Sequence, residues 1–86
     1  MLRPTAINVK AMDEYKLLLE FDNGEVKIFD AKILFNRKPY QPIKNQDIFK
    51  QVKTNNISIV WLNEIDVCPD ELYYNSMPVS NINERS

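Results

Sequence analysis

The sequence has no histidine, one cysteine and one glycine among its 86 residues. Without histidine, Ser-His-Asp and Cys-His nucleophilic sites cannot form, and the most common metal ligand is missing. The one cysteine, Cys68, cannot close an intrachain disulfide or supply the several ligands of a structural zinc site. The one glycine, Gly24, cannot make a glycine-rich phosphate loop. These absences exclude nucleotide binding through such loops, and no cofactor is expected.

Long apolar runs and an excess of one charge are also missing. The run ISIVWL, residues 57–62, is far shorter than the roughly 18 residues that a membrane span needs, and the N-terminus has no signal-peptide apolar core. Lysine and arginine number 11 against 12 aspartate and glutamate residues, for a net charge of −1. This balance gives no drive for non-specific binding to nucleic acid. We expect a soluble protein of the cytoplasm, where a single cysteine stays reduced.

The strongest local pattern is YKLLLEFDNGEVKIFD, residues 15–30, in which Asn23-Gly24 favours a tight β-hairpin turn. Placing Asp22 opposite Glu25 fixes the register. Three apolar pairs follow from this register: Phe21 with Val26, Leu19 with Ile28, and Leu18 with Phe29. The first two pairs share one face, and the third lies on the opposite face, where a packed helix is expected to cover it.

The segment before the hairpin, TAINVKAM at residues 5–12, alternates as a half-buried strand and should pair with the strand that begins at Tyr15. A connection with an odd number of residues would put Ile7 and Val9 on the apolar face of the hairpin. Residues 57–62 are rich in β-branched side chains and indicate a later, buried strand.

Three short helices are expected, each with a residue suited to cap or begin it: 31–36 after Asp30, about two turns from Asn45, and 69–75 from Pro69. The chain is therefore assigned to the α+β class. A small antiparallel sheet, made of an N-terminal three-stranded meander plus a later strand, packs with two or three short helices. With no linker or repeat in the sequence, residues 1–76 form a single compact domain and residues 77–86 a polar, frayed tail.

An acidic and aromatic corner near the C-terminus is the first candidate surface. Its residues are Trp61, Asn63, Asp66, Asp70, Glu71, Tyr73 and Tyr74. Aromatic side chains are enriched at interfaces, and acidic patches steer basic partners. The other interpretations are core packing for Trp61, and favourable charge at a helix N-terminus for Asp70 and Glu71. Tyr73 and Tyr74 are adjacent on a short helix, so they cannot both face fully inward.

A basic stretch is the second candidate surface: Lys32, Arg37, Lys38 and Lys44, with Tyr40 among them. Basic residues interleaved with an aromatic ring can bind a phosphate backbone or a single strand. A solvated loop is the other interpretation, because the net charge gives nucleic-acid binding no support.

A reactive thiol and a cation site are the two chemical candidates in the sequence. Cys68 directly precedes a helix start, where a thiol can become reactive, but the nearby carboxylates disfavour the thiolate. Asp66, Asp70 and Glu71 could hold a hard cation, although no calcium-loop pattern accompanies them. No catalytic, cofactor-binding or metal-binding residue is assigned.

The order of the motifs FDNGEV, IFKQV and WLNEIDVCPDELY resembles that of a family of small, mainly bacterial proteins known as domain of unknown function 2442. The matching positions, between residues 4 and 74, are Phe21, Asp22, Gly24, Glu25, Asp30, Phe49, Trp61, Asn63, Asp66, Pro69, Leu72 and Tyr73. Leu62 and Glu64 depart from the pattern, since the family tends to have Pro and Gly there, which bears on the turn after Trp61.

The resemblance implies a compact α+β domain with antiparallel strands and short helices, and it implies no activity. Members of the family occur alone, joined to a helix-turn-helix DNA-binding domain, or encoded beside another small protein. A toxin–antitoxin role has been suggested for such pairs.

These observations predict a non-catalytic protein-interaction module that binds itself or the product of a neighbouring gene, and no membrane. The binding surface would be a sheet edge or the acidic and aromatic corner. The alternative is an antitoxin-like or regulatory component that contacts nucleic acid through the basic stretch, or a toxin. A carboxylate-dependent metal-binding enzyme is the third hypothesis.

Overall fold

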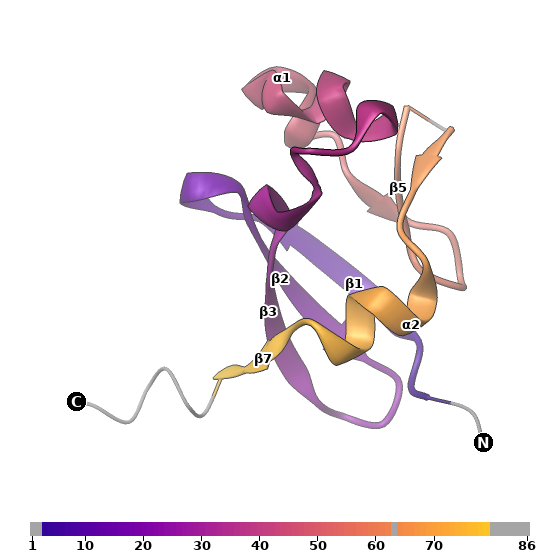
Figure 1. Cartoon of the computed structure of the whole chain (residues 1–86). Coiled ribbons are helices and arrows are strands. Elements are labelled where there is room, and N and C mark those ends of the chain that lie inside the picture. The colour runs from indigo at the N-terminus through magenta and orange to yellow at the C-terminus, as the bar shows by residue number, and fades with distance from the viewer. Residues whose placement is uncertain (1–2, 63, 80–86) are drawn as a thin grey trace.

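The N-terminal part of the chain forms an antiparallel meander in the computed structural model, which describes residues 3–62 and 64–79 (Figure 1). Strand β1 (Ala6–Ala11) pairs with β2 (Lys16–Phe21), and β2 pairs with β3 (Val26–Asp30). The short strand β7 (Met77–Pro78) adds to β3, which gives the order β1-β2-β3-β7. The meander is confirmed. The expected division into a domain of residues 1–76 and a tail of residues 77–86 stays a prediction: β7 includes the first two residues of that tail, and residues 80–86 lie outside the described residues.

A second antiparallel sheet contains β4 (Lys53–Thr54), β5 (Ile59–Trp61) and β6 (Ile65–Asp66). The later strand predicted at residues 57–62 therefore exists, but it joins this second sheet and not the meander. The helical segments are the 3-10 helices η1 (Asp13–Tyr15), η2 (Ala31–Leu34) and η3 (Lys38–Lys44), and the α-helices α1 (Gln46–Phe49) and α2 (Pro69–Tyr74). Small antiparallel sheets with short helices define an α+β protein, as expected.

Capping explains where the short helices begin. The Asp30 carboxylate accepts a hydrogen bond of 3.0 Å from the backbone N–H of Lys32, at the start of η2. The Asn45 side chain accepts one of 2.8 Å from the N–H of Asp47, at the start of α1. Pro69 occupies the first position of α2, where its missing N–H costs nothing. The predicted starts are confirmed, although α1 has one turn in place of the expected two.

The hairpin register is the main correction. The N–H of Phe21 donates to the Glu25 carbonyl (2.8 Å) and the N–H of Gly24 donates to the Phe21 carbonyl (3.0 Å), which leaves three residues in the loop. Gly24 has a φ of 90°, the left-handed conformation that such three-residue loops require at their last position. The strands are therefore shifted by one residue from the prediction, and the pairs are Leu17 with Phe29, Leu18 with Ile28, and Leu19 with Lys27.

One face of the four-stranded sheet carries the core. Its central side chains are Leu17, Leu19, Phe21 and Phe29, each at most 1% exposed. The helices η2, η3, α1 and α2 and the second sheet close this core with buried residues of their own (Figure 1): Leu34, Ile43, Phe49, Ile59, Trp61 and Leu72. The helix that was expected on the opposite face does not occur among the described residues, so that face has no covering element there.

Candidate functional site

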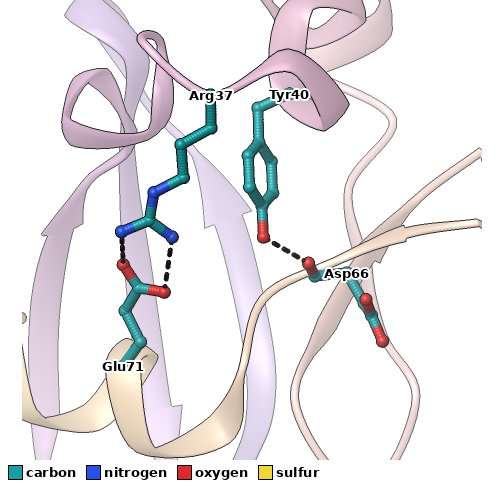
Figure 2. Close-up of polar contacts among 4 residues, drawn as sticks. All are labelled: Arg37, Tyr40, Asp66 and Glu71. Atoms are coloured by element: carbon teal, nitrogen blue, oxygen red, sulfur yellow. Dashed lines mark hydrogen bonds and ion pairs between the residues drawn. The ribbon is translucent and has the colours of Figure 1, made fainter.

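The acidic and aromatic corner and the basic stretch, predicted as two separate surfaces, meet at an ion pair. The guanidinium of Arg37 donates to both carboxylate oxygens of Glu71, with distances of 3.0 and 2.8 Å (Figure 2). Arg37 precedes η3 and Glu71 lies in the first turn of α2. The hydrogen bonds and the charge of Glu71 raise the pKa of Arg37. The pair therefore links two elements that are far apart in the sequence.

Two other contacts involve residues of the same two surfaces. The Tyr40 hydroxyl donates to the backbone carbonyl of Asp66 at 2.7 Å (Figure 2), and burial raises the pKa of this tyrosine. The Nε of Arg3 lies 3.0 Å from an oxygen of Asp70. The side chain of Asp66 stays exposed. Two of the three carboxylates of the corner are thus already neutralised by arginine.

Most residues of the basic stretch also have a partner within the chain. Lys32 lies 3.9 Å from the carboxylate of Asp30, and the ammonium of Lys44 lies 5.8 Å from the centre of the Phe35 ring. With Arg37 held by Glu71, exposed Lys38 is the member of the stretch for which the structure gives no ion pair or aromatic contact among the described residues. This arrangement weakens the case for a phosphate-binding surface, because such binding depends on unneutralised positive charge.

The aromatic members of the corner divide between core and surface. Trp61 is fully buried, and its indole N–H donates to the Phe49 carbonyl at 3.0 Å. It is a core residue, so its assignment to an interaction surface is wrong. Tyr73 is half-buried while Tyr74 is 68% exposed, which confirms that the two do not both face inward. Asn63 lies outside the described residues.

The thiol and carboxylate chemistry gains no support from the geometry. Over residues 3–62 and 64–79, no three aspartate, glutamate or cysteine side chains lie close enough together to hold a metal ion. Cys68 is exposed at the N-cap of α2 and makes no side-chain capping hydrogen bond.

The sequence interpretation missed the uncovered face of the four-stranded sheet, which we call the open face. Its outward side chains, by strand register, are Asn8, Lys10, Met12, Lys16, Leu18, Glu20, Val26, Ile28, Asp30 and Met77. None of its apolar side chains belongs to the hydrophobic core or packs against it. Met12, Val26 and Met77 are 40%, 41% and 55% exposed. The correct register would have revealed this face, because the one-residue shift moves Val26 and Ile28 out of the core.

The open face has two hollows. One, of about 510 Å³, is lined by Met12, Lys16, Ile28, Asp30, Asn75 and Met77. The other, of about 360 Å³, includes Leu18, Glu20 and Val26 in its lining. An apolar centre with a polar surround is the arrangement typical of a protein-binding surface.

The edges of the same sheet are poorly suited to pairing with another strand. Strand β7 has two residues and includes Pro78, which has no N–H to donate. On the other edge, the pairing of β1 is irregular between Ala6 and Asn8 and the strand carries the exposed Lys10. Bulges, prolines and lysines are the features that keep edge strands from adding partners.

The fold and its surface define a small α+β domain with one face of its main sheet uncovered. The model of the family described as Protein of unknown function (DUF2442) matches residues 6–78, and the chain belongs to this family. No curated protein and no solved structure matches the chain. None of the helices in the described part of the chain has the length and apolar character that crossing a bilayer requires.

The turn after Trp61, where the sequence departs from the family pattern, has a distinct backbone. Leu62 has a φ of 56°, and the N–H of Glu64 donates to the Trp61 carbonyl at 3.1 Å. Proline, fixed near −65°, could not adopt this conformation. The turn that this chain makes therefore excludes proline at position 62.

Proposed function

We propose that this protein is a non-catalytic protein-interaction module that binds its partner through the open face. The observation that carries this proposal is the row of side chains Leu18, Ile28 and Met77, which cross the centre of the sheet without belonging to the core. We also propose a cytoplasmic location, supported by the exposed, unpaired thiol of Cys68.

Physical reasoning favours the open face over the two surfaces predicted from the sequence. Burial of apolar area stabilises a complex by about 25 cal/mol per Å², and the open face offers its largest apolar side chains in one row. The acidic and aromatic corner offers less, because Trp61 is buried and Glu71 is already paired with Arg37. The edges of the four-stranded sheet are protected against strand addition, for the reasons given above.

Site-specific photo-crosslinking in cells that produce the protein tests the proposal. A benzoyl-phenylalanine residue replaces Ile28 on the open face or, as the control, Ile33 of η2, which is 45% exposed and lies off this face. We expect an adduct of discrete mass from position 28 and none from position 33. The adduct is identified by mass spectrometry, and binding of the purified partner should weaken at least about tenfold with Leu18→Glu. No adduct at position 28, or equal adducts at both positions, would contradict the proposal.

A further inference from the structure

We infer that the partner on the open face is a second copy of this chain, packed sheet to sheet about a two-fold axis. The inference rests on the proposed function and names its partner. Face-to-face packing of two sheets is a common way to bury one side of each, and most soluble homo-oligomers are symmetric dimers.

The register of the hairpin makes the open face self-complementary. Leu18 of β2 lies opposite Ile28 of β3, and Lys16 lies opposite Asp30. A two-fold axis parallel to the strands and midway between β2 and β3 exchanges these two strands. Leu18 of each copy then faces Ile28 of the other, and Lys16 of each copy faces Asp30 of the other.

The charges of the face favour a copy of the same chain over a strongly charged partner. Four charged side chains surround the apolar row, two of each sign: Lys10, Lys16, Glu20 and Asp30. A markedly acidic or basic partner would leave two of them facing like charge, which is costly at an interface. The two-fold arrangement brings Lys16, which lies 3.7 Å from Glu14 within its own chain, to Asp30 of the other copy. It lays the stem of Lys10 over Met77 and places Glu20 over Val26 of the other copy, toward one end of the strands.

The size of the face sets the strength of the dimer. Three strands about 20 Å long and the two-residue β7, spaced about 4.8 Å apart, present about 320 Å² of flat area per copy. The two copies together would bury about 640 Å², well below the roughly 1,200 Å² of stable interfaces. We therefore expect a weak dimer, with a dissociation constant above about 1 µM, that forms as the concentration rises.

Complementary charge variants test the pairing of Leu18 with Ile28. In a Leu18→Glu or Ile28→Lys dimer, the new charge faces an apolar side chain, so each variant alone should dimerise at least about tenfold more weakly than wild type. A mixture of the two variants should form a heterodimer, because Glu at position 18 of one copy faces Lys at position 28 of the other. Sedimentation equilibrium at low ionic strength gives the masses, and Ile33→Lys is the matched control that should dimerise as wild type does.

The outcomes separate this inference from the proposed function. A mixture that associates no better than its components would overturn the two-fold pairing, and so would a wild-type chain that stays monomeric up to about 1 mM. If the wild type is monomeric but position 28 still crosslinks to a different protein, the proposed function holds and the second copy is wrong. Far-ultraviolet circular dichroism checks that each variant is folded, and Ile28→Thr, which should also weaken the dimer, replaces any that is not.

Discussion

Tyr73, singled out from the sequence as a surface residue, serves mainly to tie α2 to the hairpin. Its hydroxyl donates to the carboxylate of Glu25, and its ring packs edge-on against Phe21 at 5.1 Å. The ammonium of Lys27 lies 3.8 Å from the ring centre and donates to the Tyr73 carbonyl at 3.1 Å. The hydrogen bond from Tyr73 is the main cause that lowers the pKa of Glu25, and the same bond raises the pKa of Tyr73.

This contact predicts a pH dependence of stability that Tyr73→Phe removes. A lowered carboxyl pKa contributes stability above the ordinary glutamate value of 4.5, and the contribution is lost as the pH falls through the lowered value. A raised tyrosine pKa contributes stability below its ordinary value of 10.0, and the contribution is lost as the pH rises through the raised value. The urea midpoints of the wild type and of Tyr73→Phe should therefore differ most between pH 5 and 10. They should become equal at lower and at higher pH. A difference that stays constant with pH would contradict this account.

At the scale of the element, successive side chains of β2 alternate between the core and the open face. Leu19 is fully buried in the core, whereas Leu18 points to the open face and is only half-buried. Because these two leucines are neighbours in one strand, they provide a matched test of the register.

Leu19→Ala should cost about 2–5 kcal/mol in the free energy of unfolding, because it leaves a cavity in the core. Leu18→Ala should cost less than about 1 kcal/mol, because water already reaches the side chain in the monomer. Urea denaturation at a concentration below that of dimerisation measures both. Equal costs for the two substitutions would show that an element of the chain covers the open face.

Local patterns predicted the elements better than their pairing. The hairpin, the odd three-residue connection between Met12 and Lys16, and the helix starts follow from side chains within a few residues of one another. The register does not, because Asn23-Gly24 fits both two-residue and three-residue loops. The observed register buries Lys27 opposite Leu19, and the carbonyl that satisfies Lys27 belongs to Tyr73, 46 residues later. The helix η3 was missed because Pro42 lies inside it, and proline usually ends a helical pattern.

At the scale of the whole molecule, the wrong register concealed the candidate site. It assigned Val26 and Ile28 to the core and required a covering helix for the other face. The ion pair between Arg37 and Glu71 was equally hidden, because the two residues are 34 positions apart. The sequence alone identifies the charged and aromatic residues. Which of them remain exposed for a partner depends on the strand register and on contacts between residues far apart in the chain.

The most direct test of the account is the NMR spectrum of the methyl groups as a function of protein concentration. The methyl signals of Leu18, Ile28 and Met77 should shift on dilution from about 1 mM, while those of Leu17 and Leu19 stay in place. This result would show that the second copy binds at the open face and leaves the environment of the core unchanged. Methyl signals that are all independent of concentration, or shifts confined to residues away from the open face, would contradict the account.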